Sequence, residues 1–273
     1  IDVTIDTLAP NTPLLDLQND TGHSDHDNFT ASQALDFNLT TEDPGEPANA
    51  FNLKYRLFVR PDGGAEQLIY DSSTDESVSG QNGFTSLDQI LTSVGPFPSG
   101  NHNFKLEVED RAGNISEDFL LDVTIDSIPT SATISLLTSS DSGRFDNDNV
   151  TNIDQPAFTG TGEVGSAVRL FANGQLVGVA EVQSDASDGV NGDGRGLWEI
   201  TSEPLDDGVY EFRAQVEDWA GNLANTPAIT LEVDTLAPNT PQLDLLPADD
   251  SGLSDQDNVT MEGLPTFNMA TLD

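Results

Sequence analysis

Apolar and polar residues alternate along much of this chain with the two-residue period of a β-strand. Residues 104–108 read Phe-Lys-Leu-Glu-Val, and residues 212–216 repeat the pattern as Phe-Arg-Ala-Gln-Val. Such alternation places one face of a strand in a core and the other in water. The same period recurs at 51–59, 121–125, 168–172 and 229–233. Turn signals such as Asn173-Gly174 separate these segments, so the pattern predicts an all-β fold of short strands.

Three sequence phrases recur in the same order, which predicts a tandem array. A linker phrase that begins with aspartate occurs at 6–10, 126–129 and 234–238. An acidic loop follows each linker, at 24–28, 145–149 and 254–258, and an Asp-x-Ala-Gly-Asn turn occurs at 110–114 and 218–222. We therefore expect a last-strand remnant of a preceding module at 1–6, module one at 7–126, module two at 127–234 and a partial module, truncated or split, at 235–273.

Charge limits the partners that this chain can have. It carries 48 Asp and Glu residues against 9 Lys and Arg residues, a net charge of −39. Nucleic acid is excluded as a partner because phosphate binding needs clustered cations, and an anionic membrane surface is disfavoured for the same reason. The chain has no cysteine, so disulfides and thiolate zinc sites are excluded too. Oxygen ligands are the remaining means of joining modules through a metal.

Enzymatic and membrane-spanning roles find no support in the sequence. Hydrolysis needs a nucleophile with a base or a carboxylate pair in a pocket, whereas this chain has three histidines, no cysteine, and acids that cluster at the expected ends of modules. No apolar run approaches the ~20 residues of a membrane helix. We expect no enzyme and no direct membrane insertion.

The repeated phrases resemble a known family. The Asp-Thr-Leu-Ala-Pro linkers, the Asp-Asn-Val-Thr loops and residues 205–210 and 218–222 are similar to the bacterial immunoglobulin-like (BIg-type) tandem repeats of giant secreted RTX-type and biofilm adhesins. The resemblance covers both complete modules. It implies immunoglobulin-like β-sandwich modules in a linear array, extracellular and on the bacterial cell surface. Module one departs from the pattern, because His102 stands where Tyr210 would align and extra residues occur around 40–49.

This architecture predicts where the acidic segments meet. In an immunoglobulin-like sandwich the loop between the first two strands (the A–B loop) lies beside the outgoing linker. The turn between the last two strands (the F–G turn) of the next module faces the same junction. Clustered carboxylates repel unless a cation joins them, and calcium accepts six to eight such oxygens in flexible geometry, whereas magnesium is stricter. We therefore expect several Ca²⁺ ions, mainly at module junctions.

The expected ligands form one set for each junction. The set between modules one and two is Asp20, Asp25, Asp27, Asn28, Asp126, Asp218 and Asn222. The next set is Asp141, Asp146, Asp148, Asn149 and Asp234. Asp6, Asp110 and Asn114 would serve a preceding junction, and the third loop carries Asp250, Asp255, Asp257 and Asn258. A separate calcium-like loop offers Asp185, Asp188, Asn191 and Asp193 but matches no EF-hand spacing.

Plainer interpretations of these residues stay open at this point. Asp and Asn also form turns on solvated loops without any ion, and the loop at 185–194 is alternatively a hairpin tip. Tyr210 fits the tyrosine corner of a sandwich, and Trp198 fits a core position. Trp219 would brace the linker or touch a ligand. His23 and His26 adjoin the first acidic loop without counterparts in the others, which leaves a zinc role as an alternative.

The preferred hypothesis is a structural one. The chain would be the stalk of a large bacterial adhesin, with Ca²⁺ at the junctions rigidifying the array and projecting a distal binding domain. Its partners would be neighbouring modules of the same chain, and other parts of the parent protein would bind the host or surface ligand. The alternative is that one module itself binds carbohydrate or peptide, through the segment at 40–49 or the loop at 185–193.

Overall fold

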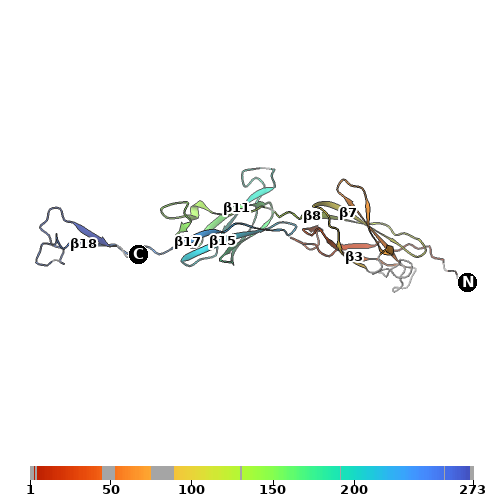
Figure 1. Cartoon of the computed structure of the whole chain (residues 1–273), viewed down its shortest axis with the longest axis horizontal. Helices are drawn as coiled ribbons and strands as arrows, with labels where there is room; N and C mark the ends of the chain where they lie inside the picture. The colour runs from red at the N-terminus through yellow and green to blue at the C-terminus, as the bar shows by residue number, and fades with distance from the viewer. Residues whose placement is uncertain are drawn as a thin grey trace.

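The chain folds into three β-structured bodies that lie end to end along one axis (Figure 1). The computed structural model describes residues 3, 5–44, 53–74, 89–129, 131–190, 192–254 and 256–270. In these residues the only helical segments are two short 3₁₀ turns, η1 (Ser72–Thr74) and η3 (Thr138–Ser140). The prediction of an all-β fold is confirmed. The described part contains no helix with the length and apolar character needed to cross a membrane.

Module one is a two-sheet sandwich. The first sheet has the strand order β1 (Leu14–Leu17), β3 (Leu35–Thr40) and β6 (Gln89–Val94). The second has the order β2 (Phe29–Thr30), β8 (Phe119–Ile125), β7 (Gly100–Glu109), β4 (Lys54–Pro61) and β5 (Gln67–Asp71). All neighbours are antiparallel except β2 and β8. The final strand, β8, runs directly into the linker at Asp126.

The alternating residues of module one close its core. Tyr55 on β4, Phe104 on β7 and Phe37 on β3 are fully buried, and the rings of Phe37 and Phe104 lie 4.9 Å apart. Each buried side chain of this size contributes roughly 1.5–3 kcal/mol relative to an exposed one. The period-two pattern therefore fixes which face of each strand looks inward, and leaves charged residues on the outer face of the five-stranded sheet.

Module two repeats the sandwich. One sheet has the order β14 (Arg195–Thr201), β11 (Ala157–Glu163) and β9 (Ser135–Leu136). The other has the order β10 (Val150–Thr151), β17 (Ile229–Val233), β15 (Gly208–Glu217), β12 (Ala167–Ala172) and β13 (Gln175–Glu181), with β16 (Leu223–Asn225) beside β15. Trp198, Phe158 and Phe212 are fully buried, which confirms the core position of Trp198.

Two local predictions for module two are confirmed, and module one differs at one of them. Tyr210 Oη donates to the Asp206 carbonyl over 2.9 Å, as a tyrosine corner does. Asn173 and Gly174 have φ of 49° and 81°, the positive values of a tight hairpin turn. In module one His102 takes the place of the tyrosine, and its Nε2 lies 2.8 Å from the carbonyl O of Pro98. That imidazole is 2% exposed and packs on Phe97.

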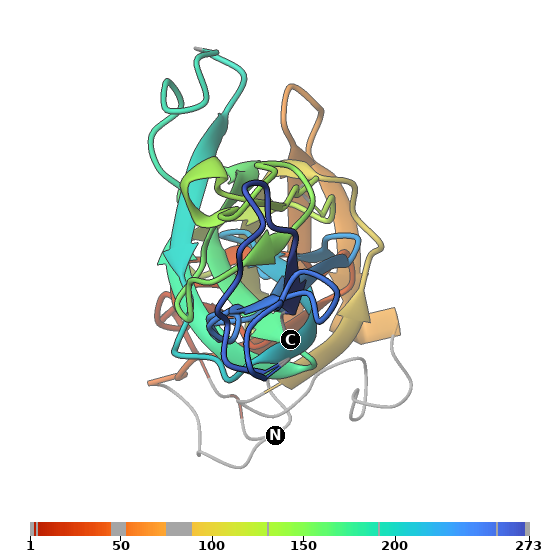
Figure 2. The same cartoon turned by 90° about the vertical axis from the view of Figure 1, so that its left-hand side faces the viewer.

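The partial third module is a two-stranded hairpin. Strands β18 (Gln242–Leu245) and β19 (Phe267–Ala270) pair with the same antiparallel register as β1 and β3. Leu245 is buried, whereas Phe267 and Met269 are exposed. Viewed along the long axis, this hairpin lies in front of module two (Figure 2).

Module one has a longer connection where the sequence predicted extra residues. The link from β3 to β4 spans 41–53, against 164–166 for the corresponding link from β11 to β12. Half of the segment at 40–49, one candidate binding surface, lies outside the described residues, namely 45–49.

Candidate functional site at the module junction

The F–G turn of module two supplies the scaffold of the junction. Asp218 Oδ1 accepts the backbone amide of Asn222 (2.9 Å), and Asp218 Oδ2 accepts Asn222 Nδ2 (2.9 Å). The backbone closes the same turn, since the Asp218 amide donates to the Asn222 carbonyl over 3.1 Å. Asp, Gly and Asn are required together because the carboxylate caps the turn while Gly221 adopts a φ of 91°. Both side chains are thereby held at the end of module two that faces module one, which we call its pole.

Asn222 ties this turn to the linker that leaves module one. Its Nδ2 donates to the backbone carbonyl of Asp126 over 2.7 Å. Asp126 in turn uses Oδ1 to accept the amide of Ile128 over 3.0 Å, which bends the linker at its first residue. The linker aspartate therefore has a fixed position against module two, and its second carboxylate oxygen remains available.

Three carboxylates from both modules meet at this point. Asp126, Glu163 and Asp218 each offer an oxygen within 4.8 Å of the other two. Glu163, the last residue of β11, is a member that the sequence analysis missed. The pKa of Glu163 is raised, first because burial penalises its charged form and then because Asp218 and Asp126 repel it. The trio is therefore an anionic cluster that spans the two modules.

The two modules also dock directly through backbone groups. The amide of His23 donates to the Trp219 carbonyl over 3.1 Å, and the amide of Ala31 donates to the Ala220 carbonyl over 3.1 Å. Thr21 Oγ1 donates to the same Ala220 carbonyl over 2.6 Å. The A–B loop of module one thus binds the F–G turn of module two, as the sandwich architecture predicted.

Glycine permits this close approach on both sides. A Cβ on Gly22, whose φ is 94°, would lie 2.0 Å from the carbonyl O of Trp219. A Cβ on Gly221 would lie 2.8 Å from the amide N of Gly22. Both distances are below any real Cβ contact, so a side chain at either glycine would force the modules apart.

Trp219 braces the docked loop. Its ring centroid lies 4.5 Å from that of His23 at an interplanar angle of 51°. On the other side, a Cβ on Gly165 would lie 2.5 Å from Trp219 Nε1, so the indole covers that glycine. The ring contact is with the A–B loop, whereas the sequence predicted that Trp219 braces the linker or touches a ligand, and 43% of the residue stays exposed.

The A–B loop of module one holds its acids apart from the trio. Asp20 Oδ2 accepts the amide of Asn28 (2.8 Å), and Asp27 Oδ1 accepts the amide of Phe29 (3.0 Å). Asp25 pairs with His26 over 2.7 Å, whereas His23 lies on Trp219, so the two histidines face different partners. In the described residues no group of three acids with oxygens within 4.8 Å includes an A–B loop residue. The structure divides the expected ligand set into two parts.

The three A–B loops share one unusual atom. Asp20 Oδ1, Asp141 Oδ1 and Asp250 Oδ1 are buried and have no hydrogen-bond partner among the described residues. In each loop the other oxygen accepts the amide of the asparagine eight residues on, over 2.8–3.3 Å. That asparagine, Asn28, Asn149 or Asn258, has a φ near 60°. Burial is the main cause that raises the pKa of Asp20, followed in the same direction by repulsion from Asp27 and Asp25.

A second trio occurs at the start of module one. Asp6, Asp43 and Asp110 offer oxygens within 4.8 Å of one another. Asn114 Nδ2 donates to the carbonyl of Asp6 (3.4 Å) and to Asp110 Oδ2 (2.8 Å), which reproduces the arrangement around Asn222. Asp43 lies just after β3, and Glu163 is the last residue of β11. Because β3 and β11 are equivalent strands of the two modules, both residues, which the sequence did not reveal, lie at the same end of that strand. An acid at that strand end was the available signal.

The other expected ligands bind their own backbone. Asp234 Oδ1 accepts the amide of Leu236 (3.0 Å), Asp148 Oδ1 that of Val150 (3.2 Å) and Asp257 Oδ1 that of Val259 (3.1 Å). Asp146 is an exposed member of the second loop. Asp255 and Asn191 lie outside the described residues.

The loop between β13 and β14 caps itself. Asp185 accepts the amides of Gly192 and Gly194, the latter over 2.7 Å, and these bonds, that of Gly192 first, lower the pKa of Asp185. Asp188 Oδ1 accepts the amide of Val190 (2.9 Å), and Asp193 Oδ1 that of Arg195 (3.0 Å). The carboxylates of this loop therefore stabilise a hairpin tip and form no three-acid group in the described residues.

Comparison with known proteins gives a family and several similar solved structures. A family described as bacterial Ig-like domain matches residues 7–127 and again residues 128–235. No curated protein matches the chain. Among solved structures, a tetra-tandem repeat in the extending region of a large adhesion protein is 21% identical, with a TM-score of 0.33, over 82% of this chain and 50% of that one.

Two further solved structures are similar to this chain over most of its length. The BSP domain of a biofilm associated protein is 14% identical, with a TM-score of 0.26, over 77% of this chain and 29% of that one. Fibronectin(III)-like modules of Clostridium thermocellum CbhA are 11% identical, with a TM-score of 0.39, over 81% of this chain and 94% of that one. The chain spans half the length of the adhesion-protein repeat.

Proposed function

Because the chain belongs to the bacterial Ig-like domain family, we propose that it forms part of the extracellular stalk of a large bacterial surface adhesin. Each module packs against the next, and the array holds a distal binding domain away from the cell. The partners of the modules are their neighbours in the same chain, and other parts of the parent protein bind the adhesion target.

The observation that carries this proposal is the docked junction. Three hydrogen bonds join the A–B loop of module one to the F–G turn of module two, and a fourth ties Asn222 to the linker. Their acceptors are backbone carbonyls, which every sequence has, and the two glycines at 22 and 221 allow the contact. A flexible tether would need none of these features, whereas a spacer of defined length needs all of them.

Calcium is the proposed cation of the trio. Two carboxylates 4–5 Å apart repel by about 3–4 kcal/mol at an effective dielectric near 20, so Asp126, Glu163 and Asp218 would loosen the junction without a counter-charge. An ion that binds Asp126 from module one and the other two from module two would join the modules. Carboxylate and carbonyl oxygens suit calcium, and extracellular modules bind it at roughly 10⁻⁴–10⁻³ M.

The A–B loop supplies a second proposed ion position. Asp20, Asp25 and Asn28 line a hollow of about 370 Å³, and Asp20 Oδ1 is buried without a partner. A buried, unpaired carboxylate oxygen is costly unless a cation or water satisfies it. The same oxygen is unpaired in the loops of Asp141 and Asp250, so each repeat would carry one such ion.

Small-angle X-ray scattering of the whole chain tests the stalk proposal. With calcium we expect a rod with a narrow distribution of lengths, and with EGTA a broader distribution and a shorter mean length. Magnesium alone should not restore the rod, because it demands octahedral geometry and keeps its water. An identical scattering profile with calcium and with EGTA would rule out calcium as the stiffening agent.

Paired variants assign the effect to one junction. Asp126→Asn combined with Glu163→Gln removes two trio charges and leaves Asp218 to cap its turn, so the length response to calcium should disappear. The matched control is Asp6→Asn combined with Asp43→Asn, in the trio away from this junction. The control should lose calcium in isothermal titration but keep the scattering response. Equal scattering behaviour of the two variants would contradict the assignment.

A further inference from the structure

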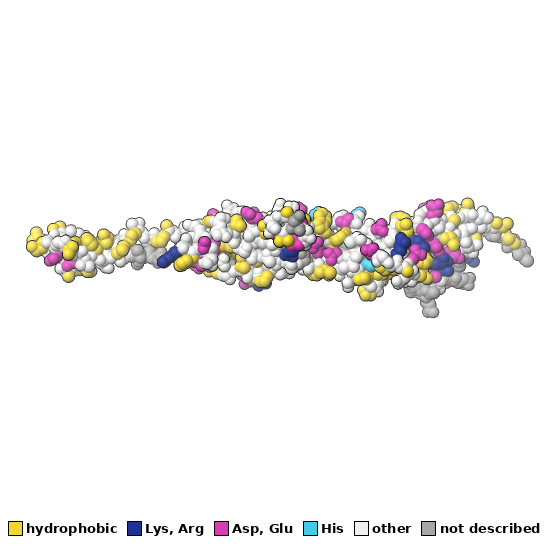
Figure 3. All heavy atoms as spheres, turned by 90° about the horizontal axis from the view of Figure 1, so that it is seen from above, with side chains coloured by type: hydrophobic (Ala, Val, Ile, Leu, Met, Phe, Trp, Pro, Cys, Tyr) yellow, Lys and Arg dark blue, Asp and Glu magenta, His cyan; other side chains and the backbone are white. Residues whose placement is uncertain are grey.

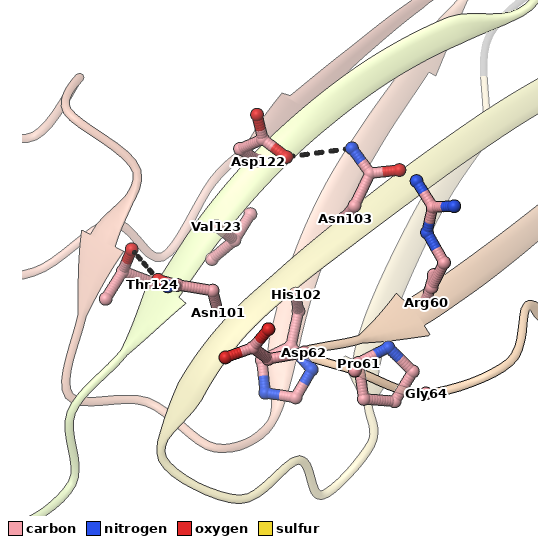
Figure 4. Close-up of a pocket in the computed structure, with 11 residues that line it drawn as sticks. Arg60, Pro61, Asp62, Gly64, Asn101, His102, Asn103, Asp122, Val123 and Thr124 are labelled. Carbon is pink, nitrogen blue, oxygen red and sulfur yellow. Dashed lines mark hydrogen bonds between the residues drawn. The ribbon is translucent and has the colours of Figure 1, made fainter.

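The outer face of the five-stranded sheet of module one carries an open groove. It has a volume of about 670 Å³, within the usual range of roughly 300–1,000 Å³ for small-molecule sites. Strands β7 and β8 form its floor, and the turn that follows β4 forms its rim (Figure 4). It lies on the flank of the module and contains no member of either acidic trio.

The floor of the groove presents polar groups in fixed orientations. Asn103 Nδ2 donates to Asp122 Oδ1 over 2.8 Å, which leaves Asn103 Oδ1 and the second oxygen of Asp122 open. Thr124 Oγ1 donates to Asn101 Oδ1 over 2.8 Å, which leaves Asn101 Nδ2 open as a donor. These partners face each other across paired strands, so the open atoms need little ordering when a ligand arrives.

Arg60 adds a strong donor at the rim. It lies opposite Asn103 in the strand register, and Figure 4 shows the Asn103 carbonyl oxygen turned toward its guanidinium. Lys54, Arg56 and Lys105 project from the same sheet and are all paired with acids. Figure 3 shows cationic side chains gathered with acidic ones over module one. Arg60 has no ion pair or hydrogen bond among the described residues, although the chain holds 48 acids.

The same surface of module two carries different chemistry. The register places Val209 and Glu211 where module one has Asn101 and Asn103. Glu211 there neutralises Arg213, with 2.6 Å between Oε1 and Nη2. In the position of Arg60 stands Asn173, whose Oδ1 accepts the amide of Glu211 (2.9 Å). The fold therefore does not require the open polar groups of module one.

From these contacts we infer that the groove of Arg60, Asn101, Asn103 and Asp122 in module one binds a neutral saccharide. Each sugar hydroxyl both donates and accepts, and the groove offers open donors beside open acceptors. Asp62 and Asp122 flank the single free cation of the described lining, and the chain as a whole is strongly anionic, so an anionic glycan is repelled. The central floor strand, β7, is paired with β4 on one side and with β8 on the other, so an extended peptide has no strand edge to join along the middle of the groove.

The lining of the groove predicts a low affinity for the saccharide. No Phe, Tyr or Trp side chain lines the described groove to stack on a sugar ring, the imidazole of His102 is buried, and the groove is open. A ligand of hexose size then binds with a dissociation constant on the order of 1 mM. Repeated display along a surface array would raise the effective affinity without any new contact. The saccharide site does not depend on the stalk proposal, because it uses none of the junction residues.

The test uses the whole chain in EGTA, so that no bound ion contributes. An array of neutral glucose, galactose, mannose and N-acetylglucosamine oligomers is screened beside sialylated glycans, and saturation-transfer NMR with methyl glycosides of the hits gives affinities. We expect neutral glycans to bind and sialylated ones to bind less. Binding confined to sialylated glycans, or no binding to either class, would overturn the inference.

Variants then place the binding in the groove. Asn101→Val combined with Asn103→Glu installs the residues that module two carries at the same strand positions, so module one should still fold, which circular dichroism checks. We expect this variant to lose at least about tenfold in affinity, and Arg60→Gln to lose about fivefold, because hydrogen bonds to charged groups are the stronger ones. The control Glu211→Gln, on module two, should bind as the parent does. Unchanged binding in both groove variants would place the sugar elsewhere and overturn the proposal.

Discussion

The F–G turns of the two modules are nearly identical in their internal bonds and differ in what lies against them. The amide of the asparagine donates to the aspartate Oδ1 over 2.8 Å at Asn114 and 2.9 Å at Asn222. Gly113 and Gly221 have φ of 90° and 91°. A Cβ on Gly113 would meet nothing within 4 Å, whereas one on Gly221 would meet the backbone of module one. The turn is therefore built by each module alone, and docking is added by the loop of the preceding module.

The acidic trios extend this comparison. The trio of Asp6, Asp43 and Asp110 has the same spacing limit as that of Asp126, Glu163 and Asp218, although only the second lies beside a docked loop. Carboxylate clustering and backbone docking are thus separate properties of a pole. A change in one should therefore leave the other measurable.

The largest effect is expected from Gly22→Ala. This change in module one places a Cβ against the Trp219 carbonyl, so the docking hydrogen bonds are lost, a coupling of about 2–4 kcal/mol for three bonds and their packing. Both tryptophans of the chain lie in module two. Tryptophan fluorescence during urea unfolding therefore reports the unfolding of module two through Trp198 in its core, and this midpoint should fall although the mutation is in module one.

Gly113→Ala is the matched control for this prediction. It also lies in module one, at a φ of 90° against 94° for Gly22, and has open space around the new Cβ. Module one should lose stability from backbone strain, while the tryptophan midpoint of module two stays unchanged. If Gly22→Ala left that midpoint in place as well, docking would not couple the modules.

Much of this junction could be predicted from sequence, and the failures have a physical reason. Period-two alternation and repeated turn signals were enough for the strands, and the sandwich topology then placed the A–B loop against the next F–G turn. The trio members Asp43 and Glu163 were missed because proximity across a pole depends on loop paths. Glu163 ends strand β11, whereas Asp43 lies in the longer connection between β3 and β4.

The A–B acids show the opposite failure. Asp20, Asp25 and Asp27 lie at the correct pole but were expected in one set with Asp126 and Asp218. Asp20 and Asp27 instead accept amides of their own loop, which holds their carboxylates away from the linker. Local Asx bonds of this kind cannot be distinguished from metal ligation by residue type alone, since both use the same oxygens.

A smaller effect is expected from pH, through Glu163. Its folded pKa is raised, so the folded state binds the proton more tightly than the unfolded state does. In EGTA the contribution of Glu163 to the stability of module two should therefore be greatest below the usual glutamate pKa and be lost as pH rises through the raised value. Glu163→Gln should flatten this part of the profile, measured by the tryptophan midpoint in acetate and phosphate buffers.

Calcium should reverse the sign of that dependence. The ion binds the deprotonated carboxylates, so with saturating calcium the midpoint should rise with pH over the same window, and Glu163→Gln should weaken the rise. If the midpoint of the parent in EGTA rose with pH over this window, and Glu163→Gln did not change the profile, the raised pKa of Glu163 would be contradicted as a cause.

The smallest effect is expected from His23→Ala, which removes a ring contact and keeps the docking backbone. The imidazole lies 4.5 Å from the Trp219 ring, and an aromatic pair of this kind contributes about 0.5–1 kcal/mol when partly exposed. The tryptophan midpoint should fall slightly, by less than with Gly22→Ala. His26→Ala is the control, because that exposed ring pairs with Asp25 and does not reach module two. Because the His23 amide still donates to the Trp219 carbonyl in the variant, a loss as large as that of Gly22→Ala would show that the side chains, and not the backbone bonds, hold the modules together.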